Sequence, residues 1–121
     1  MDETTYGFPK SERLHKRREY AAAYERGQKV QGDHLVLYVL ENHLAFNRLG
    51  LTVSRRIGNS VTRSRIKRRL REVFRTNRTA ISPPSDIIVN AKRSAARVSY
   101  QALRDDFLSA LQRWKCRVGE R

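Results

Sequence analysis

The chain lacks the cysteines that would cross-link a fold by disulfides and the long apolar runs that would anchor it in a membrane. Among its 121 residues only Cys116 is a cysteine, and no apolar run approaches the roughly 18 residues that span a bilayer. One cysteine cannot form an internal disulfide, which is typical of a reducing compartment. The first residues, Met1 to Thr5, lack the charged and apolar regions of a signal peptide. These absences predict a cytoplasmic protein with no membrane partner.

Side chains with a recognisable catalytic arrangement are also missing. The three histidines have no metal-ligand spacing with one another or with Cys116, and no Gly-rich phosphate loop or nucleophile motif occurs. Asp105 and Asp106 are neighbours on a predicted helix and point about 100° apart, so they do not form a carboxylate pair. The sequence predicts no catalytic residue and no metal site in this chain, and no small-molecule substrate.

Turn signals and apolar spacing predict one α+β domain over residues 1–121, with residues 1–7 disordered. A first helix is expected to begin after Ser11 as N-cap, to bury Leu14, Ala21 and Tyr24, and to end at Gly27. The residues before Gly32 are candidates for a short edge strand.

Two β-rich segments follow, residues 34–40 and 44–53, which we expect to pair antiparallel across a short turn at 41–43. A helix begins near residues 58–60, a third apolar strand covers 86–91, and Ser99 caps a last helix. The resulting αβββαβα order predicts a sandwich in which helices pack on a four-stranded sheet.

Positive charge is concentrated in one segment. The chain carries 26 Lys and Arg against 12 Asp and Glu, and ten of those basic residues lie from position 55 to position 78 with a single acid, Glu72. On a helical wheel Ile66, Leu70, Val73 and Phe74 share one face, within about 80°. The opposite face carries Ser64, Arg68, Arg71 and Arg75, flanked by Arg65 and Lys67.

Such a ridge of like charges destabilises an isolated helix, because neighbours at i, i+3 and i, i+4 repel one another. A charge run that only keeps the protein soluble normally includes acids. A polyanion that neutralises the ridge explains the arrangement better, and Arg forks suit bidentate contact with phosphate. The sequence therefore predicts a nucleic-acid partner.

A second candidate surface combines aromatic rings with positive charge. Tyr20 and Tyr24 lie at i, i+4 on the first helix, and Val36 and Tyr38 share one face of a strand. If these faces oppose, three rings line a groove beside the basic run that includes Arg17, as stacking of single-stranded RNA requires. The alternative is that the tyrosines are ordinary core residues.

The run from Arg48 to Glu72, RLGLTVSRRIGNSVTRSRIKRRLRE, resembles the signature of the bacterial ribonuclease P protein component. In that family a glycine-leucine strand, a basic pair, a Gly-Asn turn and an Arg-Asn-Arg-x-Lys-Arg helix occur in this order. The resemblance extends to Phe8-Pro9-Lys10, Glu19-Tyr20 and the segments 36–38 and 86–93. Two positions depart from the pattern: Ser64 replaces the family's Asn, and Asn90 replaces Ile or Val, which we interpret as a strand-end contact with solvent.

The resemblance implies a subunit that joins a catalytic RNA, in a holoenzyme that removes the 5′ leader of precursor tRNA by hydrolysis. It implies that the RNA holds the catalytic centre and most of the Mg²⁺, and that a left-handed crossover carries the basic helix. It places the single-stranded leader in the cleft formed by Arg17, Tyr20, Tyr24, Val36 and Tyr38. The residues that it assigns to the catalytic RNA are Arg55, Arg56, Arg63, Ser64, Arg65, Lys67, Arg68, Arg69, Arg71 and Arg75.

Two other classes share these general features, since small basic α+β domains are common among ribosomal proteins and RNA chaperones. The basic motif joined to an aromatic cleft separates the subunit from both, because neither alternative requires the cleft.

The charged helix makes a prediction that does not depend on any resemblance. If about five to eight phosphates are neutralised on binding, the logarithm of the RNA association constant falls against the logarithm of salt concentration with a slope of roughly −4 to −7. Filter binding or fluorescence anisotropy across a salt series measures this slope, and a value near zero contradicts the nucleic-acid prediction.

Overall fold

The structure, a computed structural model, describes residues 10–119, and the expected disorder of residues 1–7 lies outside this range. Three α-helices and four strands of the described part confirm the α+β order. They are α2 (Arg17–Arg26), β1 (Gln28–Gln31), β2 (Leu35–Glu41), β3 (Arg48–Thr52), α3 (Ser60–Thr76), β4 (Ser85–Ala91) and α4 (Tyr100–Gly119). Short 3-10 helices, η1 (Lys10–Glu12), η2 (Arg55–Ile57), η3 (Arg78–Ala80) and η4 (Arg93–Arg97), lie between them.

The strands form one mixed sheet in the order β1-β2-β4-β3. The expected edge strand before Gly32 is confirmed as β1, but the expected antiparallel pairing of β2 with β3 is wrong. β4 lies between them, antiparallel to β2 and parallel to β3. Its first five residues, 85–89, are all buried, as is typical of a strand covered on both faces. This buried strand is inserted between β2 and β3, which therefore do not pair as a hairpin.

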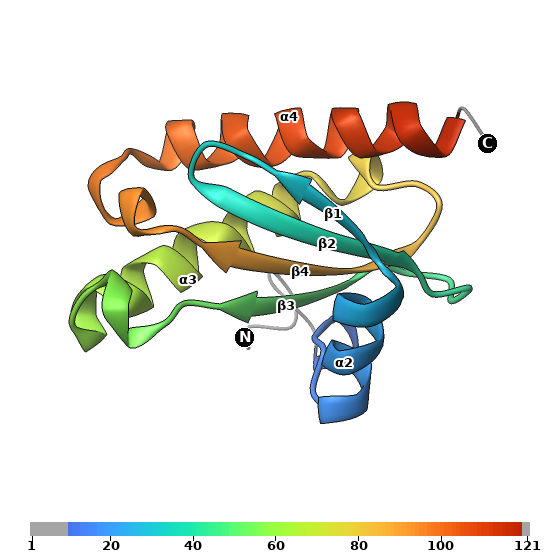
Figure 1. The fold of residues 1–121 in the computed structure, drawn as a ribbon, viewed down its shortest axis with the longest axis horizontal. Helices are drawn as coiled ribbons and strands as arrows, with labels where there is room; N and C mark the ends of the chain where they lie inside the picture. The colour runs from blue at the N-terminus through green and yellow to red at the C-terminus, as the bar shows by residue number, and fades with distance from the viewer. Residues whose placement is uncertain (1–9, 120–121) are drawn as a thin grey trace, which may run out of the picture.

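The connection from β3 through α3 to β4 is left-handed, as the resemblance implied. Figure 1 shows β3 and β4 pointing the same way, with α3 running back behind them and β4 above β3. Spacing alone favours the right-handed crossover that most βαβ units adopt.

The helices cover both faces of the sheet unequally (Figure 1). Inward side chains of β2, Leu35, Leu37 and Val39, join the main core with α3 and α4, including Phe74 and Trp114. On the other face α2 covers a smaller cluster of buried residues, Leu14, Ala23 and Ile88, with Tyr20 and Tyr38 packed against it. Among the described residues α2 covers this face only in part, and Tyr24 stays 39% exposed. No helix of the described region is both long and apolar enough to cross a membrane.

The first helix differs from the expectation at its start. Ser11 lies in η1 and is not the N-cap, and α2 begins after Lys16. Leu14 is buried as expected, but from an extended segment whose N–H donates to the Leu49 carbonyl at 3.0 Å. Ala23 is the buried alanine, whereas Ala21 and Tyr24, both expected in the core, are exposed, because the later helix start rotates the buried stripe.

The other helix boundaries are confirmed. Gly27 follows α2 and its N–H donates to Ala23 O at 2.9 Å. Asn59 caps α3 by accepting from Thr62 N–H at 2.9 Å, and Ser99 caps α4 by accepting from Ala102 N–H at 3.1 Å.

Asp106 fixes the turn between β1 and β2 from the side of α4. Its carboxylate accepts from the backbone N–H groups of Asp33, His34 and Leu35 at 2.7, 2.9 and 2.9 Å. The neighbouring Asp105 is exposed. The two carboxylates therefore point apart, as the helical spacing predicted, and the buried one serves the fold.

Replacing Asp106 with Ala leaves three N–H groups of this turn without their acceptor. We expect the free energy of unfolding to fall by at least about 3 kcal/mol, since hydrogen bonds to charged groups contribute roughly 1.5–3 kcal/mol each and water can replace only part of the three that are lost. Urea denaturation measures the loss, and Asp105→Ala is the matched control, which should stay within about 0.5 kcal/mol of the parent. Equal losses in both variants would contradict this role.

Candidate nucleic-acid interface

The outer face of α3 carries the exposed part of the basic segment. Ser64, Arg68 and Arg71 are exposed along this face, and Arg55 and Arg56 are exposed in η2 before the helix. The buried residues of α3 are Ile66, Leu70, Val73 and Phe74, the same set that the wheel assigned to the core. The helix therefore presents cations to solvent on the side opposite its apolar stripe.

Three arginines of the predicted set turn back onto the protein. Arg63 Nε donates to the Gly58 carbonyl at 3.1 Å, Arg65 Nη2 to Ala96 at 3.0 Å and Arg69 Nη1 to Val98 at 3.0 Å. Arg65 and Arg69 thus tie α3 to the segment around η4, and all three side chains are half-buried. These contacts use part of the positive charge to hold the helix in place.

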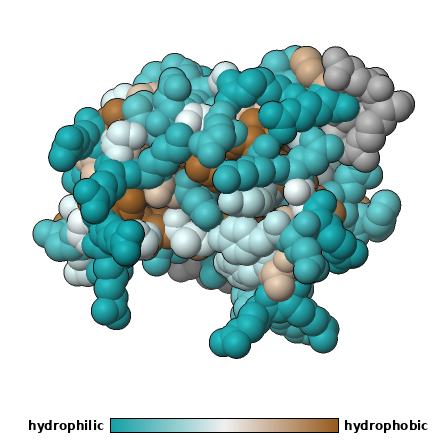
Figure 2. Space-filling model, viewed as in Figure 1, coloured by the Kyte–Doolittle hydropathy of each residue, from teal (hydrophilic) through white to brown (hydrophobic). Residues whose placement is uncertain are grey.

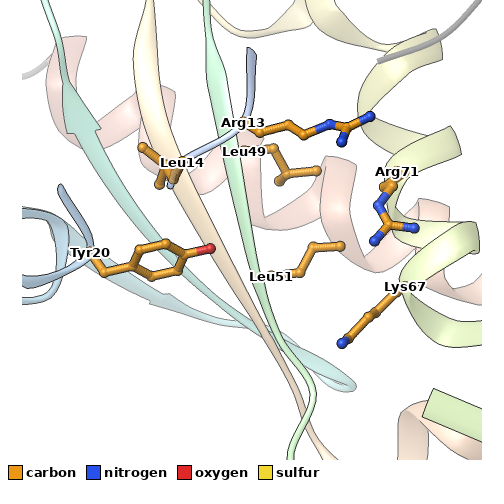
Figure 3. A pocket seen from close by; sticks show the side chains of 7 residues that line it. All are labelled: Arg13, Leu14, Tyr20, Leu49, Leu51, Lys67 and Arg71. Atoms are coloured by element: carbon orange, nitrogen blue, oxygen red, sulfur yellow. The ribbon is translucent and has the colours of Figure 1, made fainter. Parts of the chain in front are cut away.

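The remaining cations of α3 divide into two groups. Arg75 forms an ion pair with Glu72, where Nε donates to Oε1 at 3.0 Å, and this pairing lowers the pKa of Glu72. Lys67 lies on the flank of the helix that faces β3, and Arg71 lies where this flank meets the outer face; both line a pocket with Arg13 and Tyr20 (Figure 3). The basic surface therefore continues from the outer face of α3 to the edge of the sheet.

Two of the predicted cleft tyrosines meet on the open part of the α2 face. The rings of Tyr24 and Tyr38 contact edge to face, with centroids 4.7 Å apart and planes at 76°. Val36 lies two residues before Tyr38 on the same side of β2. Figure 2 shows this side of the molecule, where brown and pale side chains gather between hydrophilic ones.

Tyr20 occupies a different place from the other two rings. It packs over Gly50 of β3, where a Cβ atom would come within 2.9 Å of the Tyr20 ring. Only glycine leaves room for the ring there. Burial raises the pKa of Tyr20, although a hydrogen bond with the Leu51 backbone opposes this. Tyr20 therefore borders the pocket at β3, and Arg17 lies exposed in the first turn of α2.

Two polar residues of this cleft were missed by the sequence reasoning. The Tyr24 hydroxyl donates to Asn90 Oδ1 at 3.1 Å and lies 3.2 Å from Thr52 Oγ1. The interpretation of Asn90 as a strand-end solvent contact is wrong, because Asn90 pairs with Val36 and its side chain accepts the hydrogen bond from Tyr24. Strand alternation from the buried Ile88 would have placed Asn90 on this side, had the sheet order been known.

A charged cluster fixes α2, and with it the cleft, to the sheet. Arg48 of β3 donates to both carboxylate oxygens of Asp86, at 2.8 and 2.7 Å, and to Glu19 Oε2 at 2.9 Å. The other Glu19 oxygen accepts from the N–H groups of His15 and Lys16, both at 3.0 Å. Burial alone would raise the pKa of Glu19, but these N–H groups and Arg48 outweigh it and lower the pKa.

Together the fold and these surfaces define a small basic α+β domain with a cationic helix on one face of the sheet and an aromatic pair on the other. The Ribonuclease P family model matches residues 8–115. The ribonuclease P protein component of Syntrophus aciditrophicus is 44% identical over 91 residues, which cover 75% of this chain and 76% of that protein. That of Thermotoga maritima is 32% identical over 113 residues, covering 90% and 97%.

Solved structures agree with these relatives. The ribonuclease P protein of Staphylococcus aureus superposes with a TM-score of 0.79 at 31% identity, over 88% of this chain and 97% of that one. The Thermotoga maritima protein gives 0.77 at 31% identity, over 84% and 96%. The chain belongs to the ribonuclease P protein family, whose members are components of a tRNA-processing endoribonuclease. This membership argues against the ribosomal-protein and chaperone alternatives.

The lowered pKa of Glu19 makes stability depend on pH in a defined direction. Its ionised form stabilises the fold above the unfolded-state pKa of about 4.5, and this contribution is lost as pH falls through the lower folded-state value. We expect the free energy of unfolding to decrease less from pH 6 to pH 3 in Glu19→Gln than in the parent. Urea titrations at each pH compare the two, with exposed Glu25→Gln as control; parallel pH profiles for all three would contradict the assignment.

Proposed function

We propose that this chain is the RNA-binding subunit of ribonuclease P. It binds the catalytic RNA through the outer face of α3 and the single-stranded 5′ leader of precursor tRNA in the α2 cleft. In this way it assists the endonucleolytic cut that leaves the mature tRNA 5′ end. The observation that supports this best is the combination of an exposed cationic face on α3 with an exposed aromatic pair, Tyr24 and Tyr38, on the α2 side of the sheet, in a chain of this family.

Electrostatics favour α3 as the surface for a large folded RNA. Ser64, Arg68 and Arg71 follow one another along a face whose nearest acid, Glu72, is already paired with Arg75. Arg65 and Arg69 hold the helix rigid through the carbonyls of the η4 segment, so little side-chain and backbone entropy is lost there when RNA binds. A phosphate backbone supplies the counter-charge that the protein itself lacks.

The cleft suits a single strand. Tyr24 is 39% exposed and its ring is held by Tyr38 and by the bond to Asn90, so one aromatic face is available for a base. Hydrogen-bonding groups of Thr52 and Asn90 lie next to this ring and can contact base edges or ribose hydroxyls. Sequence-tolerant stacking is what a subunit that serves many different leaders needs.

The chemistry of cleavage is assigned to the RNA. Catalysis requires Mg²⁺, which oxygen ligands hold, and the carboxylates beside the two surfaces are already engaged: Glu19 and Asp86 by Arg48, and Glu72 by Arg75. These residues do not fit a Mg²⁺ site, so RNA phosphates would bind the metal. We place the holoenzyme in the cytoplasm, where tRNA precursors are made.

The proposal is tested by cleavage of a precursor tRNA at low Mg²⁺ with a bacterial ribonuclease P RNA. Added protein should restore cleavage and tighten substrate binding, because it neutralises phosphates that Mg²⁺ otherwise screens. Protein freed of all nucleic acid should not cut the precursor by itself. Cleavage by that preparation, or no effect of protein on the RNA reaction, would contradict the proposal.

The cleft assignment makes a separate prediction. Tyr38→Leu keeps an apolar side chain but removes the ring that positions Tyr24, so precursors with a leader should bind about 5- to 100-fold more weakly, the equivalent of one stacked base. Mature tRNA should bind the variant holoenzyme as it binds the parent. Phe46→Leu, an exposed ring outside the cleft, is the matched control. Equal losses for precursor and mature tRNA would count against a leader site.

A further inference from the structure

β3 is an edge strand whose outer side is covered only in part. The Leu49 carbonyl points away from β4 and accepts from Leu14 N–H, and Arg13 forms a parallel bridge with Leu49. Alternate residues of a parallel strand direct their backbone groups to the same side, so the Leu51 groups also face this edge. There the Leu51 backbone meets the Tyr20 hydroxyl from α2.

Cations from two other elements converge on the same edge. A cavity of about 150 Å³ is lined by Lys67 and Arg71 of α3, by Arg13 and Tyr20, and by three leucines. Figure 3 shows the side chains of Lys67 and Arg71 reaching from α3 toward β3, with Tyr20 approaching from the opposite side. Within residues 10–119, no acidic side chain lines this cavity.

This lining is suited to an anion. Lys67 and Arg71 stand at i, i+4 on one helix and repel each other, and Arg13 adds a third positive charge. Leucine walls lower the local dielectric constant and so strengthen attraction to a negative group. Tyr20 keeps its proton, since burial raises its pKa, and can donate a hydrogen bond. One tetrahedral oxyanion can accept from an ammonium, a guanidinium and a hydroxyl together.

We propose that this cavity binds one phosphate of an RNA backbone where the strand passes from the α2 cleft, around the edge of β3, to the outer face of α3. The inference rests on the proposed function and makes the two RNA surfaces one continuous path. The phosphate belongs either to the leader or to the catalytic RNA, and the two sources are separated by measuring each RNA alone.

The test is a double-mutant cycle on the full chain. Affinity is measured for a single-stranded leader RNA and, separately, for the catalytic RNA, with the parent, Tyr20→Phe, Lys67→Met and the double variant. If Tyr20 and Lys67 hold one phosphate, the fold-loss of affinity in the double variant is smaller than the product of the fold-losses in the two single variants. The difference should be about twofold or more. Lys67→Met should also make the salt slope shallower by about one unit for that RNA.

The neighbouring Arg68 provides the matched control, because it is exposed on the outer face and does not line the cavity. Tyr20→Phe and Arg68→Met should act independently. Arg71→Gln offers a second partner for Tyr20→Phe, and circular dichroism verifies the fold of each variant. Independent effects of Tyr20 with both Lys67 and Arg71 on both RNAs would overturn the phosphate site. A parent chain that binds neither RNA would instead overturn the proposed function.

Discussion

The contact on which both candidate surfaces depend is that of Arg48 with Asp86 and Glu19. Asp86 is almost fully buried on the central strand, and a buried carboxylate is costly unless it is paired. Arg48 supplies that pairing through Nε and Nη2 and donates from Nη1 to Glu19, which also caps the start of α2. One guanidinium therefore joins β3, β4 and α2. The position of α2 then decides where Tyr20 and Tyr24 lie, and hence the shape of the cleft and of the β3 pocket.

The arginines of α3 have different tasks although they lie on one helix. Arg63, Arg65 and Arg69 donate to backbone carbonyls of neighbouring segments, and Arg75 pairs with Glu72. These contacts immobilise the helix, which limits the entropy lost on binding. Arg68, Arg71 and Lys67 remain directed to solvent or to the pocket. Some arginines of this motif therefore hold the helix in position, and the others form its exposed basic surface.

The edge of β3 is where the two candidate surfaces meet. An open strand edge usually invites pairing with another chain, and proteins protect such edges with charge. Here Arg13 and Leu14 cover one end, and Lys67 and Arg71 place positive charge along the rest. The same cations that discourage a second strand would bind the phosphate that we propose there. The parallel position of β3, set by the crossover through α3, brings the helix flank and the aromatic helix to the same edge.

The sequence by itself determined the elements whose signals are local. The apolar stripe of α3, its start near residues 58–60, the Ser99 cap and the family motif followed from spacing and residue type, because a helix places neighbours by a fixed period. Only the tertiary structure decided that β4 separates β2 from β3, that α2 begins after Lys16, that Arg65 and Arg69 turn inward, and that Asn90 faces Tyr24. Each of these features depends on contacts between residues far apart in the chain. Which of the possible contacts form is decided by the packing of the whole core, so a local sequence pattern does not predict them.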